Sequence, residues 1–279
     1  MKCIHRAVAL FVFVSSPAAA QTGKGAGIDA TPLTIGETFT MQSSILGEAR
    51  RINVYAPPGY AESTDMRLPV LYMPDGGIRE DFLHVAGLIQ VSVGNGTMRP
   101  FLLVGIENTQ RRRDLTGLTA NPRDSTIAPN VGGSAAFRSF LRSELMPLID
   151  ARYRTTAESG IVGESLAGLF VVETFFLEPD LFDTYIAFDP SLWWNDAHLV
   201  SSAVERLGSD AHRGRTLYLA SSGQHELAEL TGRLAALLKQ HAGAGVVWKY
   251  HAMPDETHAT IYHPAALRAF RELFAPLPD

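Results

Sequence analysis

Ser165 stands in a pattern of small residues that is typical of a serine nucleophile. The segment reads Gly-Glu-Ser-Leu-Ala-Gly from Gly163 to Gly168, between two apolar runs. At a sharp strand-to-helix turn, a serine hydroxyl lies above the sheet, and small neighbours prevent clashes between strand and helix. The pattern predicts a nucleophile for acyl transfer, and a tight turn needed only for packing is the alternative.

A serine hydroxyl is a weak nucleophile until a base removes its proton, so a histidine is expected later in the chain. Nine histidines are present, and His258 lies in the polar segment DETHAT after the last predicted strand. A loop at that place can direct an imidazole back over the sheet, which predicts His258 as the general base. His263 precedes Pro264 at a helix start, where capping is the simpler interpretation.

A carboxylate is expected to orient the histidine and to stabilise its protonated form. Glu226 follows the predicted strand RTLYLASSG and is the first choice, with Glu229 as the near alternative. Asp189, after the preceding strand, is a further candidate. Asp255 and Glu256 adjoin the histidine, but they are expected to face solvent as loop charges.

Acyl transfer also requires hydrogen-bond donors for the tetrahedral oxyanion. The backbone N–H of Leu166, immediately after the serine, is the first expected donor. The second is expected in the segment MPDGGIRED, where Gly76 and Gly77 allow close approach of the backbone, and Gly77 is preferred. An ordinary Asp-Gly turn is the alternative. Asp75 of the same segment is assigned to substrate binding.

The elements that must position these residues alternate along the chain. Period-2 stretches at residues 38–46 and 50–60 predict an antiparallel opening pair. Short apolar runs typical of strands buried on both faces follow at residues 68–77, 100–108, 159–165, 182–190, 215–223 and 245–254. Helical periodicity occurs at residues 134–149, 166–178, 227–241 and 263–274. This order predicts an α/β fold, a mostly parallel twisted sheet with helices on both faces and ligands at the carboxyl ends of its strands.

The first twenty residues have the plan of a secretory signal. Lys2 and Arg6 supply a basic start, AVALFVFV an apolar core, and SPAAAQ a cleavage site after Ala20. The apolar run is far shorter than a membrane span, although an uncleaved N-terminal anchor is the alternative. Residues 21–36 are expected to form a flexible leader, and residues 37–279 a single domain. The protein is therefore expected to be exported, periplasmic or secreted, with no membrane insertion after cleavage.

Composition limits the chemistry further. The only cysteine is Cys3, so the mature chain can form neither a disulfide nor a thiolate site. Loss of Lys2 and Arg6 changes the formal charge from −5 to −7, which argues against general affinity for nucleic acid. No metal or other cofactor is expected, and the predicted partner is a small-molecule ester. The oligomeric state is left open.

With these residues placed, the sequence resembles the serine esterase family that includes esterase D-like enzymes and siderophore esterases of the enterobactin type. The matching blocks include VLYMPDGG, LLVGIENTQRRRDLT, IVGESLAGLF, PDLFDTYIAFDPSLWW and DETHATIYHPAAL, in family order. The resemblance implies an α/β-hydrolase fold, carboxyl-ester hydrolysis, Ser165 as nucleophile and His258 as base. Two positions depart from the family pattern, which usually has Gly at Ala167 and often Ser at Asp189.

Two further segments bear on the substrate. TQRRRDLT follows a strand, so Arg112 and Arg113 are expected to bind an anionic substrate such as a ferric catecholate. A solvated loop in which Asp114 pairs with an arginine is an equal alternative. Trp193 and Trp194 are expected to wall the pocket, or else to pack a lid segment.

The predicted function is an exported serine carboxylester hydrolase that works through an acyl-enzyme, with siderophore or aryl esters as its substrates. An acyltransferase of the same fold, as in the mycolyltransferases, is one alternative. A non-catalytic binding protein with an α/β-hydrolase-like fold is the other.

Overall fold

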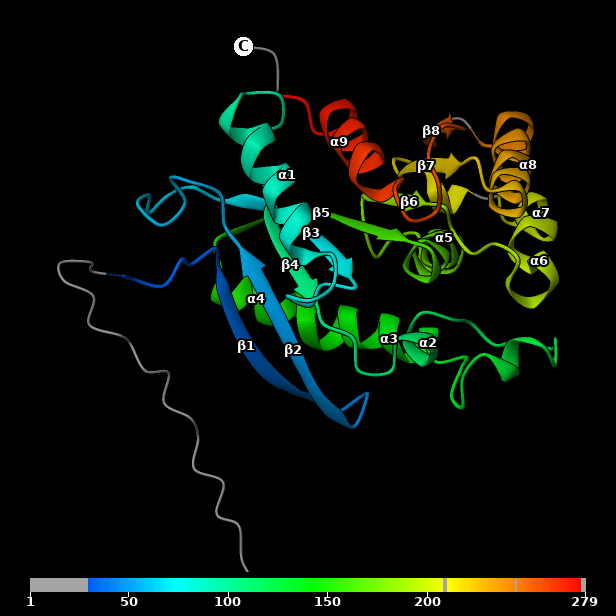
Figure 1. Ribbon diagram of the computed structural model, residues 1–279, viewed down its shortest axis with the longest axis horizontal. Coiled ribbons are helices and arrows are strands. Elements are labelled where there is room, and N and C mark those ends of the chain that lie inside the picture. Colours follow the sequence, from blue (N-terminus) through cyan, green and yellow to red (C-terminus); the bar gives the residue numbers. More distant parts are fainter. Residues whose placement is uncertain (1–29, 208–209, 244, 277–279) are drawn as a thin grey trace, which may run out of the picture. The chain divides into compact units, whose positions relative to one another are not determined.

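An eight-stranded sheet runs through the protein (Figure 1). The computed structural model describes residues 30–207, 210–243 and 245–276, so the predicted signal and residues 21–29 of the leader lie outside the described part. The described residues from Ile35 onward form one compact unit. The strands are β1 (Glu37–Ser43), β2 (Glu48–Tyr55), β3 (Leu68–Pro74), β4 (Leu102–Ile106), β5 (Thr155–Glu164), β6 (Thr184–Phe188), β7 (Thr216–Ser222) and β8 (Val247–Met253).

The sheet combines an antiparallel edge with a parallel body. Its order is β1-β2-β4-β3-β5-β6-β7-β8. β1 pairs antiparallel with β2, and β2 pairs antiparallel with β4. All later pairs are parallel, because a helical crossover between each two consecutive strands from β3 to β8 returns the chain to the same end of the sheet. The predicted antiparallel start and parallel body are therefore confirmed.

Helices cover both faces of this sheet, as predicted. On one face α1 (Phe82–Gly94) contacts α9 (Tyr262–Leu273) over a core built from Phe82, Phe188 and Phe270. The other face carries α3 (Ser134–Phe140), the π-helical turn η2 (Leu141–Leu145), α4 (Met146–Arg152), α5 (Leu166–Leu177), α6 (Trp194–Ser201), α7 (Ala203–Leu207) and α8 (His225–His241). Among the described residues there are also three short elements, α2 (Arg111–Asp114), η1 (Asp124–Thr126) and η3 (Asp210–His212). No helix in the described ranges is long and apolar enough to span a bilayer.

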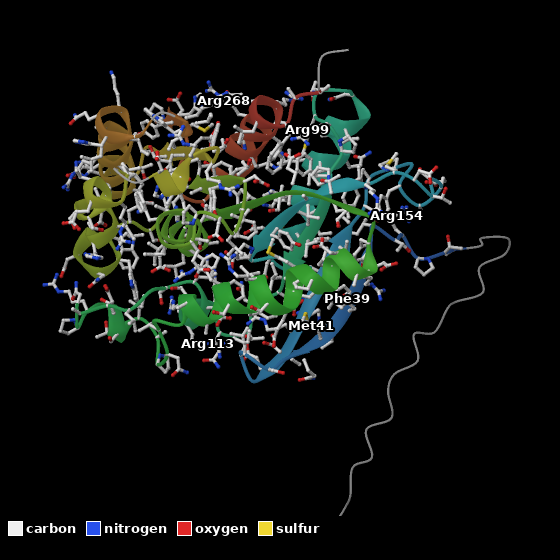
Figure 2. The ribbon with its side chains drawn as sticks, turned by 180° about the vertical axis from the view of Figure 1, so that it is seen from behind. Phe39, Met41, Arg99, Arg113, Arg154 and Arg268 are labelled. Atoms are coloured by element: carbon white, nitrogen blue, oxygen red, sulfur yellow. The ribbon has the colours of Figure 1, made fainter. Side chains whose placement is uncertain are left out.

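The edge strand β1 is held to the body through alternate side chains. Phe39 and Met41 lie on the side of the strand that faces the long helical segment α3–α4 (Figure 2) and pack against the core. The guanidinium of Arg152 lies 5.1 Å from the Phe39 ring centroid. The period-2 pattern of the sequence therefore corresponds to one core-facing and one exposed row of side chains.

Three neighbouring parallel strands end in residues with positive φ that are not glycine. Asp75 after β3, Ser165 after β5 and Asp189 after β6 have φ values of 57°, 60° and 40°. This backbone region is unfavourable for residues that carry a Cβ, and such strain is concentrated at functional sites. β3, β5 and β6 are adjacent and parallel, so all three residues lie at the same edge of the sheet.

Candidate active site

Three polar side chains form a continuous chain of contacts at this edge. His258 Nε2 lies 3.1 Å from Oγ of Ser165, although the two residues are 93 positions apart in the sequence. The other ring nitrogen, Nδ1, lies 3.0 Å from Oδ2 of Asp189. In an activated serine nucleophile, a histidine contacts the serine hydroxyl and a carboxylate orients the histidine, and these three residues have that geometry.

The backbone around Ser165 explains why its neighbours are small. Ser165 has φ 60° and ψ −121° between β5 and α5, and its N–H donates to the carbonyl of Phe188 at 3.0 Å. Its own carbonyl accepts hydrogen bonds from the N–H groups of Leu169 and Ser191. A Cβ at Gly163 would lie 2.7 Å from Ala167, and one at Gly168 would lie 3.0 Å from the Phe188 carbonyl oxygen. Only glycine fits at either position without displacement of its neighbours.

Ala167, where the family pattern usually has glycine, is fully buried. Its methyl group occupies the space that a side chain at position 163 would need. The extra methyl is accommodated because Gly163 has none.

The loop between β8 and α9 holds the histidine over the sheet. Within it the N–H of Thr257 donates to Oγ1 of Thr260 at 2.9 Å, and Oγ1 of Thr260 donates to Glu256. The N–H of Gly223, after β7, donates to the carbonyl of Glu256 at 2.9 Å. These bonds fix the loop to itself and to the neighbouring strand end, so the imidazole is held above Ser165.

Asp189 is the carboxylate beside the histidine, and the expectation that Glu226 lies there is wrong. Asp189 is fully buried, and its Oδ1 accepts the N–H of Ser222 at 2.6 Å. Glu226 is exposed in the first turn of α8, and Glu229 points to His225. The physical reason is sheet order: β6, which directly precedes Asp189, adjoins β5, whereas β7, which precedes Glu226, is one strand farther away.

A second carboxylate, Glu164, was not singled out from the sequence. Its Oε1 lies 3.6 Å from Nδ1 of His258, and its side chain is 18% exposed. Its position in the sequence, directly before Ser165, is the signal that could have indicated a place at the site. The hydrogen bond to Asp189 raises the pKa of His258, burial opposes this rise, and the charges of Glu164 and Asp189 add to it. The imidazolium form is therefore favoured at this site.

The two expected oxyanion donors differ in their availability. Leu166 is the first residue of α5, so its N–H has no acceptor within the helix. The N–H of Gly77 instead donates to Oε2 of Glu80 at 2.7 Å, in a turn closed by the Glu80 N–H to the Gly77 carbonyl. The Glu80 carboxylate that accepts the N–H three residues earlier forms one half of a capping box, and Gly77 has no side chain to form the other half. In this conformation the Gly77 amide is occupied by a carboxylate.

Asp75 and the arginines after β4 form a connected polar network. Asp75, predicted to bind substrate, receives two hydrogen bonds from Arg111, at 2.6 and 2.7 Å. Arg111 had not been selected from the sequence, but its charge acts on both Glu164 and His258. Arg111 is therefore the arginine of this segment that lies at the Ser165 edge.

The two arginines selected from the sequence differ in their environment. Arg113 pairs with Glu48 at 2.8 Å and with Asp114 at 2.6 Å. For this residue the structure therefore agrees with the alternative in which Asp114 pairs with an arginine of the loop. Arg112 is exposed and donates to the carbonyl of Ile127. Within the described chain it has no carboxylate at ion-pair distance, and its charge is free for an anion.

The two tryptophans also differ. Trp194 is 4% exposed, and its indole N–H donates to the Gly117 carbonyl at 3.0 Å, so it packs a loop. Trp193 is partly buried, and its ring centroid lies 6.1 Å from that of Trp194. The segment before it is bound to the nucleophile turn by the Ser191 N–H. Of the pair, Trp193 remains the candidate for substrate contact.

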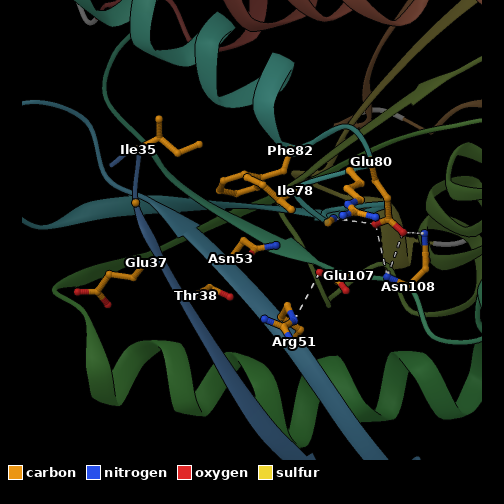
Figure 3. A pocket seen from close by; sticks show the side chains of 13 residues that line it. Ile35, Glu37, Thr38, Arg51, Asn53, Ile78, Glu80, Phe82, Glu107 and Asn108 are labelled. Carbon is orange, nitrogen blue, oxygen red and sulfur yellow. Dashed lines mark hydrogen bonds and ion pairs between the residues drawn. The ribbon is translucent and has the colours of Figure 1, made fainter. Parts of the chain in front are cut away.

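Two cavities adjoin this polar network. One of about 640 Å³ lies beside the Gly77–Glu80 turn and is lined by Arg51, Asn53, Phe82, Glu107 and Asn108, among others (Figure 3). Neither Ser165 nor His258 lines it. A second cavity, of about 460 Å³, is lined by Arg111, Arg112, Arg113, Gln110 and residues Ala128 to Asn130. In the part of the chain that the structure describes, no three His, Cys, Asp or Glu side chains are grouped to hold a metal ion.

The chain was compared with known families, proteins and solved structures, and it matches one family over most of its length. Residues 43–263 match the family described as "Putative esterase". The chain is 26% identical to the ferri-bacillibactin esterase BesA of Bacillus subtilis over 92% of its own length and 96% of that protein. It is 31% identical to the siderophore triacetylfusarinine C esterase of Aspergillus fumigatus, over 62% of this chain and 61% of the relative.

A solved structure gives the same result. The IroE-like serine hydrolase of Shewanella oneidensis superposes with a TM-score of 0.77 at 29% identity, covering 86% of this chain and 80% of the other. Its similarity agrees with the mostly parallel sheet and the antiparallel start described above. The chain therefore belongs to this esterase family of the α/β-hydrolase superfamily, and it is a carboxylic ester hydrolase.

Proposed function

We propose that the protein hydrolyses siderophore esters by an acyl-enzyme mechanism in which Ser165 is the nucleophile. The observation that carries this proposal is the row of contacts from Ser165 Oγ to His258 Nε2, and from His258 Nδ1 to Asp189 Oδ2. His258 takes the serine proton as Oγ attacks the ester carbonyl, and then gives it to the departing alcohol. Water, activated by the same imidazole, releases the acid.

The oxyanion of the tetrahedral intermediate accepts a hydrogen bond from the Leu166 N–H, which has no helical acceptor. The Gly77 N–H is the proposed second donor. It becomes available when the Glu80 carboxylate, which now accepts its hydrogen bond at 2.7 Å, is displaced. The cavity beside the Gly77–Glu80 turn provides room for that displacement.

Two observations support a siderophore as the ester. Several relatives are named for siderophore ester hydrolysis, including the Bacillus and Aspergillus proteins. The arginine-lined cavity presents the free charge of Arg112, and a planar guanidinium can bind catecholate or hydroxamate oxygens of a ferric complex. The esterase names of the relatives favour hydrolysis over acyl transfer or binding alone.

The mechanism is tested by p-nitrophenyl butyrate hydrolysis with the wild-type protein and Ser165→Ala. The variant is expected to lose at least about 10³-fold in kcat, because no other group replaces the nucleophile. A fluorophosphonate probe is expected to label wild type only. Equal turnover by both folded proteins, or labelling that survives the substitution, would refute Ser165 as nucleophile.

The substrate is tested separately, by comparing ferric trilactone siderophores with short alkyl and aryl esters. A kcat/KM for the ferric complexes that exceeds those of the simple esters is the expected result. Preference for short esters would reject the siderophore while leaving the esterase mechanism intact.

Export is the remaining part of the proposed function, and it rests on the signal-like pattern of residues 1–20. Expressed with its full N-terminus in a bacterial host, the protein is expected in the periplasmic fraction with Gln21 as its first residue. Recovery of the uncut chain from the cytoplasm would contradict export.

A further inference from the structure

Two carboxylates, rather than one, lie against Nδ1 of His258. Asp189 Oδ2 is 3.0 Å from this nitrogen, and Glu164 Oε1 is 3.6 Å from it. A single N–H makes a short linear hydrogen bond with one acceptor at a time. Asp189 therefore accepts the hydrogen bond, while Glu164 remains within ion-pair distance.

Glu164 is held where its charge matters. It is the last residue of β5, its side chain is 18% exposed, and the strained Ser165 follows it directly. Charged and titratable groups face it from the surrounding elements, namely His258, Asp81, Asp189, Arg111 and Tyr262. Burial raises the pKa of Glu164 to about 7; the imidazolium of His258 opposes this rise, and Asp81 and Asp189 add to it. Its charge therefore changes in the same pH range as that of a histidine.

We propose that Glu164 is a positioning residue for His258, a second carboxylate that stabilises the imidazolium and accepts the Nδ1 hydrogen bond when Asp189 cannot. The inference rests on the proposed function, in which His258 is the general base. Glu164 makes no contact with the ester in this role. It acts through the imidazole, by charge in the wild type and by hydrogen bonding when Asp189 is altered.

The sign of the effect follows from the charges. An ionised Glu164 favours the protonated histidine and so keeps His258 inactive as a base to higher pH. Removal of this charge moves the acid limb of kcat/KM to lower pH. It also lowers the plateau, because the imidazolium formed in the transition state loses part of its stabilisation.

The first experiment measures kcat/KM for p-nitrophenyl butyrate from about pH 5 to about pH 9 in wild type, Glu164→Gln and Glu164→Asp. Glu164→Gln is expected to shift the acid limb on the order of one pH unit lower and to reduce the plateau about threefold. Glu164→Asp keeps the charge, so its acid limb is expected to lie nearer that of wild type. Glu229→Gln, an exposed carboxylate on α8, is the matched control and is expected to match the wild type.

The second experiment is a double-mutant cycle of Glu164→Gln and Asp189→Asn. Asp189→Asn alone is expected to lose about 10²-fold in kcat/KM, since Glu164 can still accept the hydrogen bond from Nδ1–H. The double variant is expected to fall by a further 10²-fold or so, toward the roughly 10⁴-fold loss of a histidine without any acid. Thermal denaturation shows that each variant is folded.

An acid limb in Glu164→Gln that coincides with that of wild type would overturn the inference. So would a double variant whose loss is only the product of the two single losses. If Asp189→Asn does not fold, the pH profiles of the Glu164 variants decide alone. Activity that survives Ser165→Ala would instead remove the proposed function, so the two failures are distinguishable.

Discussion

Asp189 Oδ2 accepts a hydrogen bond from Nδ1 of His258 at 3.0 Å, across 69 positions of the sequence. The N–H of Ser222 holds the other carboxylate oxygen at 2.6 Å, so the carboxylate is fixed from both sides. Asp189 is fully buried, and its charge is directed at the imidazole. These contacts predict that Asp189 is the carboxylate that orients His258, and substitution of Asp189 tests the prediction.

Asp189→Asn and Glu226→Gln are expected to behave differently. The first removes the charged acceptor that His258 Nδ1 now uses and is expected to lower kcat/KM about 10²-fold. The second changes an exposed side chain on α8 and is expected to have no measurable effect. Steady-state hydrolysis of p-nitrophenyl butyrate measures both. Loss of activity in Glu226→Gln with a silent Asp189→Asn would reverse the assignment.

The pH dependence follows from the raised pKa of His258. The hydrogen bond to Asp189 favours the protonated imidazole, which cannot act as a base. Activity is therefore expected to fall as pH decreases through this raised pKa, at a higher pH than for an unperturbed histidine. In Asp189→Asn the pKa of His258 falls, so the acid limb moves to lower pH. A profile that moves to higher pH in this variant would contradict the assignment.

Arg112 is expected to contribute to substrate charge recognition. Arg112→Gln removes the one cation of the arginine-lined cavity that lacks a carboxylate partner in the described chain, and KM for an anionic ferric siderophore is expected to rise about tenfold. KM for the neutral p-nitrophenyl butyrate is expected to stay unchanged. Arg213→Gln, an exposed arginine paired with Asp210, is the matched control. Equal effects of Arg112→Gln on both substrates would argue against this role.

Gly163→Ala tests the packing of the nucleophile turn. The added Cβ would lie 2.7 Å from both the Cβ and the carbonyl carbon of Ala167, so the variant is expected to lose about 1–3 kcal/mol of unfolding free energy. Adding Ala167→Gly is expected to restore only part of this loss, because the backbone contact remains. Urea denaturation measures both variants. Full stability in Gly163→Ala would show that the turn is not tightly packed.

Glu48 is expected to contribute to stability in a defined pH window. Burial favours its neutral form, but hydrogen bonds from Arg113, Thr109 and Arg50 outweigh this and lower its pKa to about 2. The stabilisation is present above the pKa of the unfolded chain and is lost as pH falls through the folded value. Glu48→Gln is thus expected to cost at most about 3 kcal/mol near neutral pH, and progressively less from about pH 5 to about pH 2. A difference in urea midpoint that is independent of pH would contradict the prediction.

Local patterns in the sequence were sufficient for most of the fold. The period-2 stretches became β1 and β2, the buried apolar runs became the parallel strands, and the helical stripes became α3–α4, α5, α8 and α9. Helix α1 was not predicted, because its apolar residues surround much of its circumference and show little periodicity. In the structure one face of α1, with Phe82, Val85 and Ile89, is buried against the core, whereas the apolar Leu83 and Val91 are exposed and mask this stripe in the sequence.

The sequence by itself determined Ser165 and its turn, because glycine, serine and alanine at fixed spacing report a local steric requirement. It also placed His258 after the last strand. It did not determine which carboxylate meets the histidine, or that Arg111 rather than Arg113 lies at the site. Those choices depend on which strand ends are neighbours in the sheet, a long-range property that no local spacing records. Tertiary structure selected Asp189 and added Glu164, because β5 and β6 lie side by side and end together beneath one imidazole.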